Sequence, residues 1–243
     1  TQTVLHPSIG WVAPVVALTH DNSLFGFVGP FAGSRYRFQV SPAVGGWKFT
    51  GALADVRRYF FARPFTLAVR GLFYGRFGRD GSQFPVLLGN PDFIRGYTAG
   101  SLIRHECYQQ VQTLAPFIGG GGVGLTTGCA DLDQLIGSRI GVANIEFRFP
   151  LTRSLALGFL PVSLPPIEGA LFYDVGIAWE NGSTIVRRRT DTESPETHRA
   201  PLQSWGGSIR VNFIGIPLKF DYAKPLNRTY KQAYWTISVG PTF

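Results

Sequence analysis

The sequence predicts an all-β fold, a transmembrane antiparallel β-barrel, to which this chain contributes about nine strands. Apolar and polar residues alternate with period 2 in many short segments, tight and long connections alternate along the chain, and aromatic residues gather near segment ends. The composition agrees, since 16% of the 243 residues are charged while 44% are hydrophobic. Soluble domains carry roughly 25% charged residues. The chain therefore has few charges with which to cover a water-exposed surface.

The clearest alternation lies in the second half of the chain. Five segments place apolar residues on one face and polar or small residues on the other: 143–149, 171–179, 209–213, 216–222 and 235–243. Each is expected to form a strand with an apolar face toward lipid and a polar face toward the barrel interior. Glu146 and Asp174 both fall on the polar, inward face.

The first half alternates less regularly. Residues 35–40 and 67–73 still alternate, but the segment that starts at Trp47 changes phase near Asp55, where we expect a β-bulge. Residues 12–22 alternate poorly and contain Pro14, which is typical of an edge or end strand. We find no convincing amphipathic helix, and no run of about 18 apolar residues that could span a membrane as a helix.

The connections between these segments differ in length in a regular way. Residues 61–64 and 214–215 are tight, whereas 75–137 and 181–204 are long and polar or glycine-rich. Outer-membrane barrels alternate short periplasmic turns with longer external loops, whereas a soluble β-sandwich, the alternative fold, has no reason to do so. Aromatic residues near strand ends are typical of an interfacial girdle, and the candidates are Trp47, Tyr59, Trp179, Tyr222 and Trp235.

Several features that would indicate other functions are weak. The net charge is +8, but the basic residues are scattered, and the run 187–189 lies in a polar stretch typical of a solvated loop, so we expect no nucleic-acid partner. The run 119–124 matches G-x-G-x-x-G without a surrounding βαβ unit. His20 beside Asp21 is the one histidine pairing suggestive of catalysis, and no nucleophile motif accompanies it. We therefore expect no enzyme, cofactor or metal site; an outer-membrane enzyme that uses His20 is an alternative.

The only two cysteines flank a glycine-rich segment. We expect Cys107 and Cys129 to form a disulfide that closes this segment, because thiolate metal sites normally offer closely spaced cysteine pairs. Such a bond indicates an oxidising compartment outside the cytosol.

Four segments resemble the insertase and translocator superfamily of BamA/TamA-type barrels, the bacterial surface-antigen proteins. They are N-P-D-F-I-R-G-Y at 90–97, A-N-I-E-F-R-F-P at 143–150, L-F-Y-D-V-G-I-A-W at 171–179, and 209–226, which ends in D-Y-A-K-P-L. The first resembles the loop motif of the family, normally written with Arg-Gly-Phe, from which Tyr97 departs mildly. The resemblance covers 67–243 well, and 1–66 loosely resembles barrels fused to TolB-like β-propellers.

The resemblance also implies a set of site residues. In the family the Arg-Gly loop folds into the lumen, so we expect residues 75–137 to form a lumenal loop with Arg95, Gly96 and Tyr97. Its arginine would pair with Glu146 and Asp174 on the inner wall. The last segment resembles the signal by which outer-membrane barrels are recognised for insertion, and its outward residues are Trp235, Ile237, Val239 and Phe243.

The function implied by this resemblance is to insert, assemble or translocate other outer-membrane or surface proteins in the bacterial outer membrane, without cofactor or covalent chemistry. The expected partners are outer-membrane lipids, client β-barrel or surface proteins, and other envelope subunits. A structural or pore-forming barrel in an envelope complex is the alternative.

The strand count bears on how much of a barrel is present. The chain contains no methionine, which indicates processing or a longer parent protein. The family barrel has about sixteen strands, and five of the roughly nine strands predicted here follow the Arg-Gly loop. We expect residues 1–243 to be one outer-membrane barrel domain that is incomplete at its amino terminus. A complete barrel of about eight to ten strands is the alternative.

Overall fold

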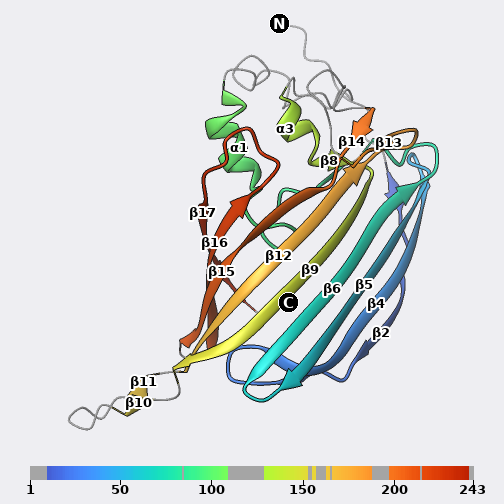
Figure 1. Cartoon of the computed structure of the whole chain (residues 1–243). Helices are drawn as coiled ribbons and strands as arrows, with labels where there is room; N and C mark the ends of the chain where they lie inside the picture. Colours follow the sequence, from blue (N-terminus) through green and yellow to red (C-terminus); the bar gives the residue numbers. More distant parts are fainter. Residues whose placement is uncertain are drawn as a thin grey trace, which may run out of the picture.

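A computed structural model describes most of the chain. The described residues are 10–83, 85–108, 129–152, 155–156, 163–164, 166–187, 197–213 and 215–240. Their main feature is one large antiparallel sheet, strongly curved and open along one side (Figure 1). The all-β barrel-type fold predicted from the sequence is confirmed, and the sheet is the wall of part of a barrel. A β-sandwich would need two large facing sheets, which the described strands do not form.

The main sheet runs in the order β1-β4-β5-β6-β9-β12-β15-β16-β17, and β2 and β3 also pair with β4. Its strands are β1 (Trp11–Val12), β2 (Val16–Asp21), β3 (Leu24–Phe25), β4 (Pro30–Gly45), β5 (Phe49–Ala62), β6 (Phe65–Phe77), β9 (Arg139–Thr152), β12 (Ile167–Trp179), β15 (Leu202–Phe213), β16 (Ile216–Pro225) and β17 (Tyr234–Val239). The described residues also form three small ribbons: β7 (Val86–Leu87) with β8 (Ile136–Gly137), β10 (Leu155–Ala156) with β11 (Ser163–Leu164), and β13 (Thr184–Ile185) with β14 (His198–Arg199).

The period-2 pattern assigns the two faces of this sheet. In β9, Ile145 and Phe147 lie on the convex face and are exposed, whereas Asn144 and Glu146 lie on the concave face and are buried. The pattern repeats in β12, where Leu171 is exposed and its neighbours are buried. The convex face is therefore apolar, as a lipid-facing surface requires, and the concave face carries the polar side chains.

The phase change near Asp55 has a cause other than a bulge. The expected bulge is wrong, because β5 keeps an unbroken register with both β4 and β6. Leu53 faces the concave side and packs against the core near one end of the sheet. Further along β5 the concave residues become polar, while Val56 and Phe60 on the convex face become the apolar ones. Along β5 the apolar residues therefore move from the concave to the convex face, while the backbone pairing stays regular.

The same register turns the Tyr59 side chain inward, so the prediction that Tyr59 belongs to the aromatic girdle is wrong. It lies on the concave face with Asp55, and its side chain is 4% exposed. Trp179 ends β12, and Tyr222 packs against Trp235 with 4.9 Å between ring centroids, both exposed on the convex face.

The two edges of the sheet are formed by the first and last strands. Pro14 separates β1 from β2, and among the described strands β2 pairs with β4 alone, so the predicted edge strand is confirmed. At the opposite edge, β17 pairs only with β16 among the described strands.

The connections define two ends of the sheet. The turn end carries the tight connections between β5 and β6 and between β15 and β16. The loop end carries the long β6–β9 connection, residues 78–138, whose described part includes the helices α1 (Ala99–His105) and α3 (Ala130–Asp133). The sequence did not predict these helices, because seven and four residues are too few for an amphipathic period to be visible. No helix in the described parts is long and apolar enough to cross a membrane.

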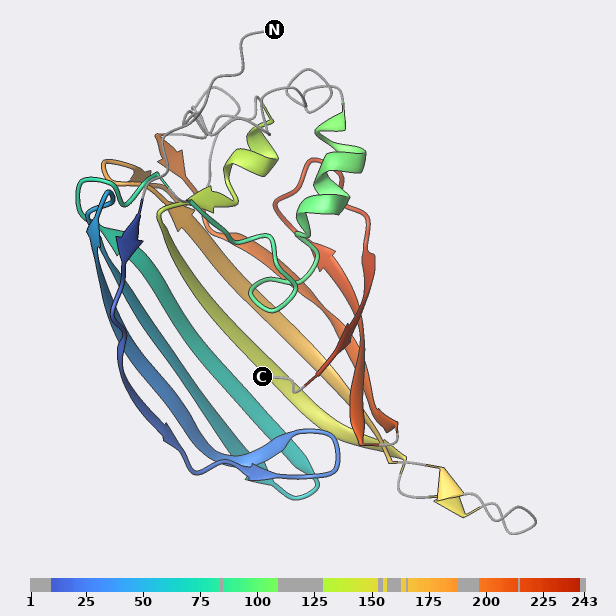
Figure 2. The same ribbon diagram turned by 180° about the vertical axis from the view of Figure 1, so that it is seen from behind.

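The β6–β9 connection covers the concave face near the loop end (Figure 2), and the residues of the hydrophobic core come from both of them. The core combines residues of the connection, such as Leu88, Ile94 and Leu102, with wall residues, such as Ile140 and Ala178. Burial of these side chains fixes the connection against the wall, which positions the polar residues described next.

Candidate functional site on the concave face

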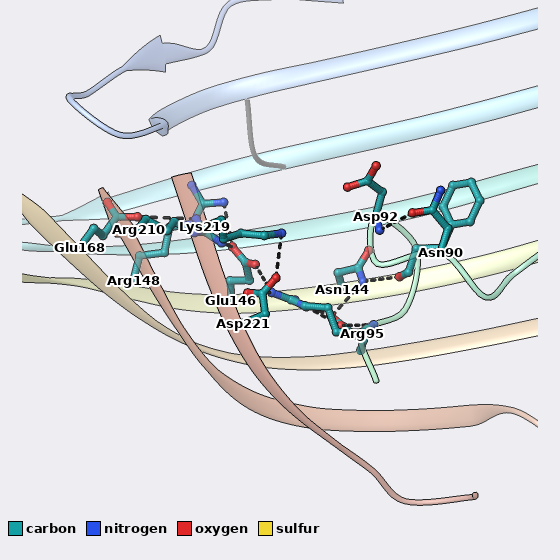
Figure 3. Close-up of polar contacts among 12 residues, drawn as sticks. Asn90, Asp92, Arg95, Asn144, Glu146, Arg148, Glu168, Arg210, Lys219 and Asp221 are labelled. Atoms are coloured by element: carbon teal, nitrogen blue, oxygen red, sulfur yellow. Dashed lines mark hydrogen bonds and ion pairs between the residues drawn. The ribbon is translucent and has the colours of Figure 1, made fainter. Parts of the chain in front are cut away.

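The β6–β9 connection carries Arg95 onto the concave face (Figure 3). A turn starts at Asn90, whose side-chain oxygen accepts from the backbone N–H of Asp92 at 2.9 Å and whose carbonyl accepts from that of Ile94 at 3.0 Å. Ile94 is fully buried in the core, and Arg95 is the next residue. The turn and this apolar anchor together direct the guanidinium toward the wall.

Arg95 contacts both carboxylates that were expected to receive it. Its Nε and Nη2 donate to the two oxygens of Asp174, each at 2.7 Å, and its Nη1 donates to Glu146 Oε1 at 2.7 Å. Arg95 is 3% exposed, and the carboxylate side chains are 1% exposed or less. Charge-assisted bonds with this bidentate geometry favour one orientation of the loop.

Two further wall residues hold the same loop. The Arg95 guanidinium stacks on the Phe172 ring, with 3.4 Å between its carbon and the ring centroid. Asn144 Nδ2 donates to the Phe93 carbonyl and to Asp174, both at 2.9 Å. The alternation places both residues on the inward face, but it gives no indication of what would lie opposite them.

Glu146 also joins Arg95 to a larger ionic network. Its Oε2 accepts from Arg148 Nη2 at 2.9 Å and from Arg210 Nη2 at 2.6 Å. Asp221 lies 3.6 Å from Arg95 and 3.2 Å from Lys219. With Glu168, which is 3.6 Å from Arg210, the network contains four cations and four carboxylates: Arg95, Arg148, Arg210, Lys219, Glu146, Asp174, Asp221 and Glu168. A buried network of balanced charge avoids the cost of an unpaired ion.

The network reaches the turn end of the concave face. Arg148 Nη1 donates to the Pro30 carbonyl at 2.8 Å, and Asn212 Nδ2 donates to the Phe27 carbonyl at 2.9 Å. These carbonyls belong to the hairpin between β3 and β4, which crosses the turn end (Figure 2). The hairpin is therefore bound to β9 and β15, two strands that are not its neighbours in the sheet.

Gly96 adopts a backbone conformation that favours glycine. Its φ is +84°, and a Cβ there would lie 3.4 Å from Ala223 Cβ and 3.4 Å from Pro225 Cδ. We expect Gly96→Ala to destabilise the fold by about 1–3 kcal/mol, because a non-glycine residue is strained at positive φ. The free energy of unfolding in detergent micelles measures this loss.

Gly100 supplies the control for that substitution. It lies in α1 without a positive φ, and a Cβ there would meet no atom within 4 Å. Gly100→Ala should be neutral or slightly stabilising, because alanine is the better helix former. Equal stabilities of the two alanine variants would contradict the strain assigned to Gly96.

Tyr97 stands where the family motif has phenylalanine, and its additional hydroxyl makes two hydrogen bonds. The hydroxyl donates to the Gln203 carbonyl at 2.9 Å and accepts from the Asn227 backbone N–H at 3.0 Å. Burial raises the pKa of Tyr97 to about 12, so the hydroxyl remains a protonated donor at neutral pH. Tyr97 thereby joins β15 to the β16–β17 connection.

The predicted disulfide is present in the structure. Cys107 and Cys129 are bonded, with their Cα atoms 5.4 Å apart, and both side chains are buried. The bond joins the chain just after α1 to the residue before α3. The disulfide therefore links α1 covalently to α3.

The remaining candidates from the sequence lie elsewhere. Trp235, Ile237 and Val239 are exposed on the convex face of β17, while Phe243 lies outside the described residues, as do 119–124 and 188–189. His20 stacks on Tyr36 at 4.8 Å, whereas Asp21, the next residue of β2, accepts from Ser23. Within the described chain, no group of three or more His, Cys, Asp or Glu residues could hold a metal ion.

Comparison with protein families identifies this architecture. The family model described as the Omp85 superfamily domain matches residues 26–243. The chain belongs to the Omp85 superfamily. The match includes the Arg95 loop and every main-sheet strand from β4 to β17.

A solved structure shows the same fold for this Omp85 chain. The crystal structure of BamA from Haemophilus ducreyi lacking POTRA domains 1-3 superposes with a TM-score of 0.60 at 14% sequence identity. The alignment covers 93% of this chain and 42% of that one, so the Omp85 chain spans less than half of the length of the protein it matches. A search of curated proteins finds no match.

Proposed function

We propose that this Omp85 chain lies in the bacterial outer membrane and belongs to a barrel that inserts, assembles or translocates other outer-membrane or surface proteins. The observation that carries the proposal is the edge strand β17. It forms a ladder with β16 from Ala223↔Tyr234 to Leu218↔Val239, and no described strand pairs with its other side. An edge of this kind can accept a client strand by β-augmentation.

The outward side chains of β17 support this role. Trp235, Ile237 and Val239 are exposed on the convex face, where they continue the apolar surface formed by residues such as Ile145. A client strand added to this edge would continue the same apolar surface, which suits a segment passing into lipid.

The strand lengths also support a weakened membrane next to this edge. β9, β12, β15 and β16 have 14, 13, 12 and 10 residues, respectively. At about 3.4 Å per residue, the wall becomes shorter toward β17. A short hydrophobic span thins the adjacent bilayer, which would ease entry of a client strand.

The ionic network on the concave face has a complementary role in this proposal. Arg95 holds the β6–β9 connection against the central strands, so the wall stays rigid while the edge remains available. The mechanism needs no cofactor and no covalent chemistry. Its partners are outer-membrane lipids, client β-barrel or surface proteins and other envelope subunits.

Site-specific photocrosslinking in the native membrane tests the edge. A photoreactive residue at Ile237 is expected to form adducts with newly synthesised β-barrel proteins, identified by pulse labelling and mass spectrometry. The same residue at Ile209, exposed on the convex face of β15, should form none, because that strand is paired on both sides. Ion conductance without adducts at Ile237 would instead support the pore-forming alternative.

A further inference from the structure

The connection that leads into β17 is bound residue by residue to the β6–β9 connection. Four successive backbone or side-chain groups of residues 227–230 take part. Asn227 binds Tyr97, and Thr229 binds Asp131. Arg228 binds Glu106, Gly96 and Ser101. Tyr230 also binds Glu106. These contacts lie just before β17, the strand whose edge is proposed to accept a client strand.

Arg228 is the centre of this contact. Its Nε and Nη2 donate to the two oxygens of Glu106 at 2.8 and 2.6 Å, and its Nη1 donates to the Gly96 carbonyl at 2.9 Å. The guanidinium carbon lies 4.4 Å from the ring centroid of Tyr234, the first residue of β17. The Arg228 side chain is 1% exposed, so this pair is shielded from solvent. Loss of one partner would leave a buried, uncompensated charge.

Two carboxylates, one near each cysteine of the disulfide, accept hydrogen bonds from the β16–β17 connection. Glu106 immediately precedes Cys107, and Asp131 lies two residues after Cys129. Asp131 Oδ2 accepts from the Thr229 backbone N–H at 3.2 Å, and Glu106 Oε1 accepts from that of Tyr230 at 3.3 Å. The cysteines are 22 residues apart in sequence, so the bond keeps the two acceptors together without relying on the intervening chain.

An edge strand is sensitive to such restraint. Among the described strands, the six residues of β17 pair with β16 alone, so fewer backbone bonds oppose its local opening than oppose that of a central strand such as β15, which is paired on both sides. Its attachment through residues 227–230 is therefore a large part of what holds it. We propose that Glu106, Asp131 and the Cys107–Cys129 disulfide form a clamp that positions β17 and limits its separation from β16. The clamp deepens the proposed function, since it would regulate access of clients to that edge.

Hydrogen exchange of the full protein in nanodiscs tests the clamp. In the Cys107→Ser/Cys129→Ser variant, amides of residues 234–239 are expected to exchange about tenfold faster, because local opening controls their exchange. Glu106→Gln should act in the same direction, while residues 140–147 of β9 should not change. Asp80→Asn is the matched control, because Asp80 lies in the same connection but accepts from the Lys48 backbone N–H, away from the clamp.

Unchanged exchange in residues 234–239 of both clamp variants would overturn the clamp. If the double serine variant loses the heat-modifiable gel mobility of a folded barrel, the folded wild-type protein is treated with dithiothreitol, and the same exchange is expected to accelerate.

Crosslinking from Ile237 separates the clamp from the proposed function. Faster exchange with more client adducts in the clamp variants supports both. Faster exchange with no adducts in any variant overturns the proposed function and leaves the clamp in place. Unchanged exchange with normal adducts overturns the clamp alone.

Discussion

Arg95→Glu is expected to abolish assembly of the folded barrel. The substitution places a fourth carboxylate among Glu146, Asp174 and Asp221, all buried, and removes the cation that these groups share. Removing one partner of a buried ion pair costs about 3–5 kcal/mol, and total stabilities are about 5–15 kcal/mol. Repulsion adds to that loss, so little folded protein should remain. Heat-modifiable gel mobility after expression measures the folded fraction.

Arg79→Glu is the matched control for this charge reversal. Arg79 lies in the same β6–β9 connection, but its side chain is 73% exposed and contacts Asp80 at the surface. Solvent screens such a pair, so the variant should assemble like the wild type. Normal gel mobility of the Arg95→Glu variant would show that this arginine does not lock the loop.

Glu146→Gln is expected to have the second large effect, without any change in side-chain size. Glu146 faces three arginines, Arg95, Arg148 and Arg210, and the amide cannot neutralise them. Removal of this buried charge should cost about 3–5 kcal/mol or more, because three cations lose their shared partner. The urea concentration at half-unfolding, measured by tryptophan fluorescence in micelles, reports the loss.

Glu168→Gln shows whether that loss is specific. Glu168 lies on the neighbouring strand β12, is 26% exposed, and contacts Arg210 at 3.6 Å. Because it is partly solvated and makes one long contact, its substitution should shift the unfolding midpoint far less. Equal shifts for the two variants would mean that Glu146 is not the centre of the network.

The alternation predicted the orientation of the wall residues but not their partners. Period 2 places Glu146 and Asp174 inward because it is a local property of an extended chain. Their partner Arg95 was suggested by resemblance to a family and not by periodicity. Phe172 falls on the same inward face as Asp174 although it is apolar, and only the approach of the loop shows that its ring supports a guanidinium.

Long-range contacts account for most of what the sequence did not reveal. Arg228 and Glu106 are 122 residues apart, and nothing local in either segment indicates the other. Tyr59 was misassigned because an aromatic residue near a strand end suits either face, and the register with β4 and β6 decides between them. The helices α1 and α3 form where the connection packs on the core, which is a tertiary effect.

The hairpin between β3 and β4 bears on permeation. It crosses the concave face at the turn end, and the β6–β9 connection crosses the same face nearer the loop end (Figure 2). An ion diffusing along this face would meet two barriers in series. Both depend on one carboxylate, since Glu146 binds Arg95 directly and orients Arg148, which holds the Pro30 carbonyl. A continuous aqueous path along this wall would require both barriers to move, so the arrangement opposes ion flow along the concave face.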